Sequence, residues 1–214
     1  GIAFAVIGGV KPNPRLGLAR EAIREAIAFG ADLILAVGGG SVIDTAKATA
    51  HGTANPEADI WDIWMGKVKL EKSLPVGVVL TIPAAGSEGN CGSVITNEDG
   101  NYKLGYSHPS LFPVFSILNP ETTFTLPPYQ TAAGAVDTIA HTLGAYITDD
   151  TESYLVQNIG ESVIRTVVKY APIALENPTD YNARAQLMWA ATTAANSTIS
   201  NGCRHDGTSH IVEH

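Results

Sequence analysis

A glycine cluster directly after an apolar run constrains the fold of this chain more than any other stretch. Residues 32–37 have the composition of a buried strand, and Gly38-Gly-Gly-Ser41 follows as a turn into a helix predicted over 42–50. Glycines let a backbone approach a phosphate closely, and a helix N-terminus offers free N–H groups and a positive dipole end. The cluster matches neither G-x-G-x-x-G nor a Walker A sequence. It therefore predicts a phosphate-binding turn or, alternatively, a tight strand-to-helix connection.

Short β-rich runs alternate with helical patterns as far as residue 126, which indicates βαβ units and a largely parallel sheet. Strands are predicted over 3–7, 32–37, 76–82, 93–96, 103–106 and 114–118, and helices over 16–29 and 42–50. After Leu126-Pro-Pro128 the pattern becomes helical, over 130–147, 153–175 and 181–199, with a further start near Gly207. We therefore predict an α/β domain over 1–126 and an all-α domain over 127–214.

A second loop, Thr81-Ile-Pro-Ala-Ala-Gly-Ser-Glu-Gly-Asn90, lies at the C-terminal end of the strand predicted from Val76. In open parallel sheets, ligands bind in crevices at these strand ends. The hydroxyls of Thr81 and Ser87 suit a ribose or a nicotinamide amide. The alternative is a polar loop that caps the next element.

Two pairs of side chains at helical spacing indicate a metal site. Asp137 and His141 fall at i and i+4 in an Ala-rich helix, one turn apart on one face. His210 and His214 repeat the spacing near the end of the chain. A carboxylate and imidazoles are typical ligands of a borderline divalent ion. The first pair alone fits a helix-start Asp and a core His better than a metal site, and it is the second pair that favours the metal.

Composition excludes several classes of protein. The net charge of −8 at pH 7 argues against a nucleic-acid or acidic-membrane surface. Cys91 and Cys203 match no disulfide or CxxC pattern, so we expect a reducing, cytoplasmic location. No apolar run has the length of a membrane span. Gly1 lacks a preceding Met and a basic region, so we expect no signal peptide. Because the last pattern breaks off at His214, we also expect that both ends are cut.

Other side chains of interest are predicted to have structural roles. Lys47 follows the glycine turn but is predicted to be a surface residue rather than a phosphate ligand. Trp61, Trp64 and Trp189 are assigned to core and inter-element packing, because their neighbours are not basic as single-stranded nucleic-acid binding would require.

Taken in order and at their spacings, the motifs resemble those of the iron-containing (group III) alcohol dehydrogenases. They are Gly38-Gly-Gly-Ser-Val-Ile-Asp44, Thr81-Ile-Pro-Ala-Ala-Gly-Ser-Glu88, Asp137-x-x-x-His141 and Asp206-Gly-Thr-Ser-His210-x-x-x-His214. Gly8-Gly-Val-Lys-Pro-Asn-Pro14 and Met188-Trp-Ala-Ala-Thr192 are similar to the butanol dehydrogenase and broad aldehyde reductase branch. Each piece is weak, but the ordered set is specific and spans the chain.

The resemblance implies a Rossmann-like dinucleotide-binding domain and a helical metal-binding domain, with NAD(P)H, Fe²⁺ or Zn²⁺ and a homodimeric assembly. Asp137, His141 and His210 match three metal ligands, and His214 matches a histidine beside the nicotinamide and the substrate. The implied cofactor-binding positions are Gly38, Gly39, Gly40, Ser41, Thr81, Ser87, Asn90, Lys103 and Leu126. The chain departs from the family in two places, since the fourth metal ligand and the first β-α unit have no counterpart.

The implied activity is metal-dependent hydride transfer between NAD(P)H and a small aldehyde or primary alcohol. The ion would act as a Lewis acid on the carbonyl or alkoxide oxygen, and His214 would relay the proton. Two alternatives stay open. One is a dehydroquinate-synthase-like lyase that uses nicotinamide and metal without net redox. The residues of the motifs, which are similar to the butanol dehydrogenase branch, disfavour it. The other is a fragment unable to complete its metal site.

Overall fold

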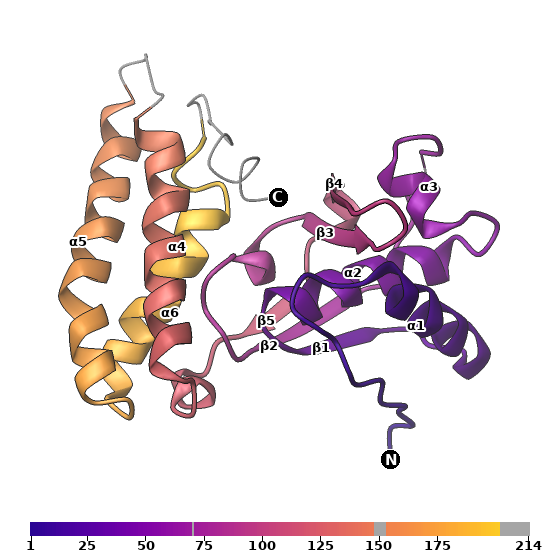
Figure 1. Ribbon diagram of the computed structural model, residues 1–214, viewed down its shortest axis with the longest axis horizontal. Helices are drawn as coiled ribbons and strands as arrows, with labels where there is room; N and C mark the ends of the chain where they lie inside the picture. The colour runs from indigo at the N-terminus through magenta and orange to yellow at the C-terminus, as the bar shows by residue number, and fades with distance from the viewer. Residues whose placement is uncertain (70, 148–152, 202–214) are drawn as a thin grey trace. The chain divides into compact units, whose positions relative to one another are not determined.

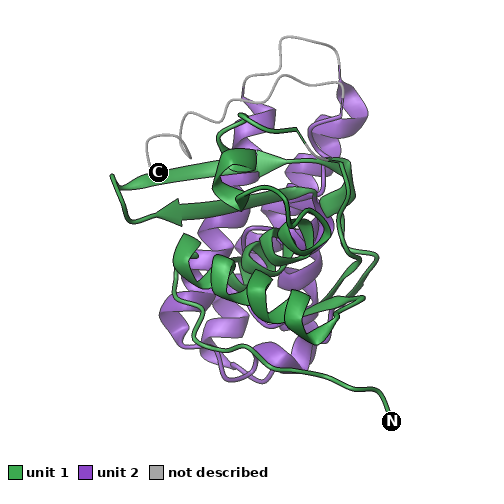
Figure 2. Ribbon diagram, turned by 90° about the vertical axis from the view of Figure 1, so that its right-hand side faces the viewer, with its two compact units in different colours: residues 1–78, 91–116 green, residues 79–90, 117–214 purple. Residues whose placement is uncertain are grey.

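The structure, a computed structural model, describes residues 1–69, 71–147 and 153–201. Backbone contacts divide the chain into two compact units (Figure 2). Unit 1 comprises Gly1–Val78 and Cys91–Ser116, and unit 2 comprises Val79–Asn90 and Ile117–His214. The second candidate loop therefore belongs to the same unit as the C-terminal helices. The boundary near residue 126 stays a prediction.

Unit 1 is the α/β part of the chain. Its helices are α1 (Leu16–Phe29), α2 (Gly40–Ala54) and α3 (Ile60–Trp64), with a 3₁₀ turn η2 (Pro109–Leu111). A three-stranded sheet has the order β1-β2-β5, with β1 Ile34–Gly38, β2 Val76–Leu80 and β5 Phe115–Ile117. A separate hairpin pairs β3 (Gly92–Asn97) with β4 (Tyr102–Ser107).

Strand direction follows from the first hydrogen bonds of the three-stranded sheet. The Ile34 N–H donates to the Pro75 carbonyl at 3.0 Å, and the Val114 N–H donates to the Val76 carbonyl at 2.8 Å. The three strands thus begin at the same end and run parallel, as the βαβ pattern predicts. The hairpin is antiparallel, because a short turn joins its strands and leaves no room for a crossover helix.

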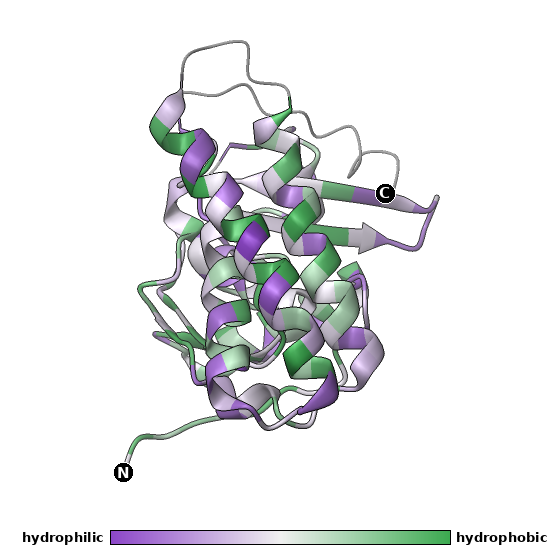
Figure 3. Ribbon diagram, turned by 90° about the vertical axis from the view of Figure 1, so that its left-hand side faces the viewer, coloured by the Kyte–Doolittle hydropathy of each residue, from purple (hydrophilic) through white to green (hydrophobic). Residues whose placement is uncertain are grey.

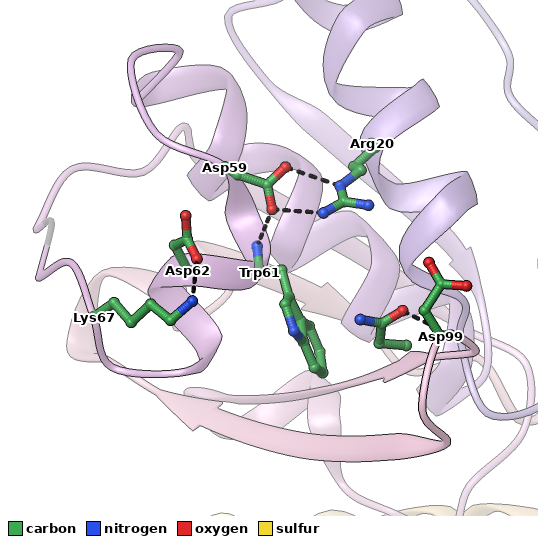
Figure 4. Close-up of polar contacts among 7 residues, drawn as sticks. Arg20, Asp59, Trp61, Asp62, Lys67 and Asp99 are labelled. Atoms are coloured by element: carbon green, nitrogen blue, oxygen red, sulfur yellow. Dashed lines mark hydrogen bonds and ion pairs between the residues drawn. The ribbon is translucent and has the colours of Figure 1, made fainter.

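The elements of unit 1 begin and end where local chemistry requires. Helix α1 ends at Gly30, which takes the left-handed conformation with φ 71°. Helix α3 is capped by Asp59, whose carboxylate accepts the Trp61 N–H at 2.9 Å (Figure 4). The Arg20 guanidinium of α1 donates to both Asp59 oxygens at 2.8 Å, and this hydrogen bonding lowers the pKa of the Asp59 carboxyl. The core that these helices cover contains Leu16, Ala19, Ala48, Ile60, Trp61, Ile63, Trp64, Ile95 and Leu111.

Three predictions for the fold are wrong. Residues 3–7 form no strand, and Phe4 and Val6 are exposed, because this segment has no neighbouring strand among the described residues to satisfy its backbone. Lys47 is fully buried rather than at the surface, and its ammonium donates to the Gly92 carbonyl at 2.8 Å. Trp189 is 64% exposed instead of packed in a core, although Trp61 and Trp64 are buried as predicted.

Unit 2 contains three long helices that lie side by side (Figure 1). They are α4 (Pro128–Tyr146), α5 (Tyr154–Glu176) and α6 (Tyr181–Ala195), accompanied by 3₁₀ turns η1 (Ser87–Gly89) and η3 (Pro120–Thr123). Pro128 suits the first helical position of α4, and the Asp180 carboxylate caps α6 by accepting the Ala183 N–H at 2.8 Å. Apolar and polar residues alternate along α5 with helical period (Figure 3). The buried side chains between the helices are Ala135, Val163, Val167, Ala174, Ala183, Leu187, Ala190, Ala194 and Ile199.

The predicted helices correspond to α4, α5 and α6, although α6 ends at Ala195 instead of 199. The start predicted near Gly207 lies outside the described residues. Within the described ranges, none of the helices combines the length and the apolar character needed to cross a bilayer.

Candidate functional site

The glycine turn of unit 1 forms an open helix N-terminus. A Cβ at Gly38 would lie 2.5 Å from the Val42 side chain, so the strand can turn this closely into α2 only with glycine. The N–H groups of Val42 and Ile43 donate to the Gly39 carbonyl at 3.0 and 3.1 Å. Gly40 and Ser41 come before the first residues whose N–H groups bond within the helix, so the helix offers no carbonyl to their N–H groups. The first turn also contains no acidic residue. This end of α2 can therefore accept an anion such as a phosphate.

The two charged residues after the turn do not face such an anion but bind strand β3. The Asp44 carboxylate accepts the Val94 N–H at 2.9 Å, and the Ser93 hydroxyl donates to the Asp44 carbonyl at the same distance. Lys47 reaches the Gly92 carbonyl, as described above. Lys103 lies in β4 opposite Thr96 of β3. Asp44 and Lys47 thus hold the sheet hairpin against α2.

The predicted metal pair is formed in unit 2. On α4, Nε2 of His141 lies 3.6 Å from Oδ1 of Asp137, with side-chain exposures of 17% and 33%. Two ligand atoms at ~2.0–2.2 Å from one tetrahedral ion lie about 3.4 Å apart, so little movement would let both groups bind one ion. A carboxylate and an imidazole also match the donor preference of Fe²⁺ and Zn²⁺. The residues present fit such an ion.

A third ligand is not found among the described residues. Within them, no group of three or more His, Cys, Asp or Glu side chains is placed to share an ion. His210, the predicted third ligand, and His214, the predicted proton relay, lie outside the described residues. The structure therefore brings together two of the three predicted ligands, Asp137 and His141.

The loop from Thr81 to Asn90 packs on the two helices α4 and α6. A Cβ at Gly134 of α4 would collide with the Pro83 carbonyl, and a Cβ at Gly86 would collide with the Ala195 side chain of α6. The Asn90 amide donates to the Ala195 carbonyl at 3.3 Å. Glycines at these two close approaches thus let the backbone of the loop lie directly on the helices.

A buried polar contact also holds this loop. The Thr192 hydroxyl of α6 donates to Oε1 of Glu88 at 2.6 Å. Both side chains are buried, with exposures of 6% and 4%. Ser87 is buried as well, whereas Thr81 is half-buried. Glu88 and Asn90 of the loop thus bind α6, while the Pro83 carbonyl lies against Gly134 of α4, the helix that carries Asp137 and His141.

Leu126 lines a small cavity in unit 2. The cavity has a volume of about 10 Å³ and is also lined by Pro83, Thr131, Thr138 and Arg184. This volume is about that of one water molecule and excludes a nicotinamide ring. Arg184 is 3% exposed, and desolvation lowers its pKa. Its guanidinium donates to the Thr131 hydroxyl at 2.7 Å and to the Pro178 carbonyl at 2.9 Å, which joins α4 to the start of α6.

The predicted site residues thus fall into two groups. Unit 1 holds Gly38, Gly39, Gly40, Ser41 and Lys103, and unit 2 holds Thr81, Ser87, Asn90, Leu126, Asp137 and His141. Glu88 and Thr192 lie in motifs that resemble the family, but the sequence predicts no separate role for either of them or for Gly134. A glycine inside an Ala-rich helix was the one local signal of a close backbone approach.

Comparison with known proteins agrees with this arrangement. The family model described as "Iron-containing alcohol dehydrogenase" matches residues 1–120, and that of the C-terminal part of the same family matches residues 131–214. NADH-dependent butanol dehydrogenase B of Clostridium acetobutylicum is 40% identical over 213 residues, which are 100% of this chain and 54% of that protein. NADPH-dependent aldehyde reductase YqhD of Escherichia coli is 37% identical, over 100% of this chain and 56% of its own length.

Solved structures give the same result. The crystal structure of NADH-dependent butanol dehydrogenase A from Thermotoga maritima superposes with a TM-score of 0.90 at 46% identity, covering 94% of this chain and 50% of that one. The chain spans about half the length of the curated relatives it matches. Since both parts of the family are matched in order, and its relatives are this similar over the whole chain, the chain belongs to the iron-containing alcohol dehydrogenase family.

Proposed function

We propose that this chain carries out metal-dependent hydride transfer between NAD(P)H and a small aldehyde or primary alcohol. The observation that carries the proposal is the Asp137–His141 pair, whose ligand atoms lie 3.6 Å apart on a helix that also packs against the candidate cofactor loop. Family membership and the activities named for its relatives, butanol dehydrogenases and an aldehyde reductase, support the same reaction. We further propose a homodimer in the cytoplasm, by analogy with the family and from the composition.

The residues of the chain divide the work. The N–H groups at the Gly38–Ser41 turn would bind the pyrophosphate, with Gly39 and Gly40 leaving room for it. The family resemblance implies five further cofactor-binding positions, Thr81, Ser87, Asn90, Lys103 and Leu126. Because the N-terminal end of α2 is neutral or positive, it favours the negative charge of either nucleotide.

The helical unit would hold the metal and the proton. Asp137 and His141 would hold a divalent ion together with His210, and His214 would exchange a proton with the substrate oxygen. When bound, the ion supplies Lewis acidity toward the carbonyl or alkoxide oxygen. The carboxylate of Asp137 lowers the net charge of the site, which favours a divalent over a monovalent ion.

The direct test is an aldehyde-reduction assay on the purified protein supplied with Fe²⁺ or Zn²⁺. We expect butanal to consume NADH or NADPH, with one butanol formed per nucleotide oxidised, and we expect His141→Ala to lose this activity. Glu161→Gln, on the surface of α5, is the matched control and should keep it. Nucleotide that binds but is never consumed in the presence of aldehyde would favour a reaction without net redox, as in the lyase alternative, and would overturn the proposal.

A further inference from the structure

The hydrogen bond between Thr192 and Glu88 joins residues 104 positions apart in the sequence. At 2.6 Å it has the length of a charge-assisted O–H···O⁻ bond, whereas the same hydroxyl lies 3.1 Å from the Met188 carbonyl of its own helix. A threonine hydroxyl has one proton, so the shorter contact takes it. Both groups are buried, and an unmade bond at a buried site is costly.

The bond acts on a loop whose backbone is already close to α6. A Cβ at Gly89 would lie 3.1 Å from the Asn196 side chain and 3.2 Å from that of Thr192. Gly86 approaches Ala195, as described above, and the Asn90 amide binds the Ala195 carbonyl. Glycine contacts limit how close the loop comes, but they carry no directional bond. The shorter carboxylate–hydroxyl bond and the longer Asn90 amide bond therefore give the loop its directional attachment to α6.

Glu88 follows Ser87 directly and precedes Asn90 by two residues, and both of these are candidate cofactor-binding positions. We propose that Glu88 and Thr192 are positioning residues, which set the loop from Ser87 to Asn90 for nicotinamide nucleotide binding. The inference rests on the proposed function, because it takes this loop to contact the nucleotide. Its specific content is that breaking the bond weakens nucleotide binding and leaves metal binding by Asp137 and His141 unchanged.

The test compares variants of Thr192 by titration with NADH and NADPH and, separately, with Zn²⁺. Thr192→Val keeps the volume and removes the donor, and we expect nucleotide affinity to fall about ten-fold. Thr192→Ser keeps the donor and should restore most of the affinity. Thr193→Val is the control on the same helix, since that hydroxyl donates to the Trp189 carbonyl one turn earlier, and it should have no effect. Zn²⁺ affinity should be the same in all three variants and in the wild type.

A double-mutant cycle shows whether the two residues act as one unit. Glu88→Ala should weaken nucleotide binding as much as Thr192→Val, and the double variant should be no weaker than either. Glu88→Gln keeps the shape and an acceptor oxygen, so we expect a loss of about three-fold from the weaker neutral bond. If Thr192→Val does not fold, Glu88→Gln carries the test, and unchanged nucleotide affinity in it overturns the inference.

The proposed function and the positioning role of Glu88 and Thr192 can be refuted separately. If the wild type binds neither nucleotide, the proposed function fails and the inference fails with it. If the wild type binds a nucleotide and reduces aldehyde, but Thr192→Val and Glu88→Ala bind it equally well, only the positioning role is overturned. A uniform fall in nucleotide and Zn²⁺ affinity would show a general structural role and would also overturn it.

Discussion

Replacing His141 by alanine tests the metal site most directly. In the structure Nε2 of His141 and Oδ1 of Asp137 are 3.6 Å apart, close to the separation of about 3.4 Å expected for two ligands of one tetrahedral ion. Since little rearrangement is needed, the loss of one ligand is not offset by relief of strain. Groups that only hydrogen-bond to a metal ligand are worth roughly 10–100-fold in metal affinity, so we expect a direct ligand to be worth on the order of a hundred-fold or more.

This loss can be measured as a change in stability. A metal at a hundred times its dissociation constant stabilises the wild type by about 2.7 kcal/mol. At the same concentration, a hundred-fold weaker variant would gain only about 0.4 kcal/mol from the same relation. Without metal the two proteins should differ by less than about 1 kcal/mol, because the Asp137–His141 contact is partly exposed.

The assay is urea unfolding of the wild type and His141→Ala, each with and without Zn²⁺. Glu161→Gln is the matched control, because Glu161 forms an i, i+4 contact with Arg165 at 2.8 Å on the surface of α5. That variant should keep the full stabilisation by the ion. An equal gain from Zn²⁺ in the wild type and in His141→Ala would refute the assignment of His141 as a ligand.

Three further predictions follow from the described geometry. Gly39 has extended backbone angles (φ −94°, ψ −168°) that valine also adopts, so Gly39→Val should keep the melting temperature within a few degrees. The same variant should weaken NAD(P)H binding more than about ten-fold, measured by calorimetry. Equal affinity would contradict the pyrophosphate assignment. Arg184→Met should lower the free energy of unfolding, measured in urea, by about 1–2 kcal/mol. Arg184→Lys should lower it more, because lysine keeps a buried charge but lacks the planar guanidinium that reaches both acceptors. The reverse order would contradict this reasoning. Because the pKa of Asp59 is lowered, its carboxylate stabilises the fold by about 0.5 kcal/mol after solvent screening, and this stabilisation is fully present above its ordinary pKa of 3.8. It is lost as the pH falls through the lowered pKa. Arg20→Met should remove this acid-dependent part of the unfolding free energy, and an unchanged pH profile would contradict the reasoning.

Local spacing in the sequence was sufficient for most of the elements and for the contact between Asp137 and His141. The period of apolar residues, the proline at the start of α4 and the glycine after α1 predict α1, α2, α4, α5 and α6 to within a few residues, but not the short helix α3. The i, i+4 spacing of Asp137 and His141 predicts a shared face, and the distance between them confirms that the two side chains meet. These features depend on helix geometry alone, which is the same wherever the helix lies in the fold.

Burial depends instead on which surfaces meet, and spacing does not encode that. Lys47 has the pattern of a surface lysine, but α2 is covered on nearly every side and its ammonium finds a backbone carbonyl of β3. Trp189 is a large aromatic residue of the kind expected in a core, but it is exposed. Residues 3–7 have strand propensity, yet a strand forms only when a neighbour accepts its hydrogen bonds.

The sequence by itself determined most of the helices and strands in their order, the glycine turn and the contact between Asp137 and His141 on α4. Only the tertiary structure decided that the loop from Thr81 to Asn90 belongs to the helical unit, although it follows a strand of the sheet. The reason is physical: Gly86 and Gly134 allow backbone contacts, and Glu88 meets Thr192, between segments that are far apart in sequence. Glycine inside the Ala-rich α4 indicates a close backbone approach, but the sequence does not tell which segment approaches it.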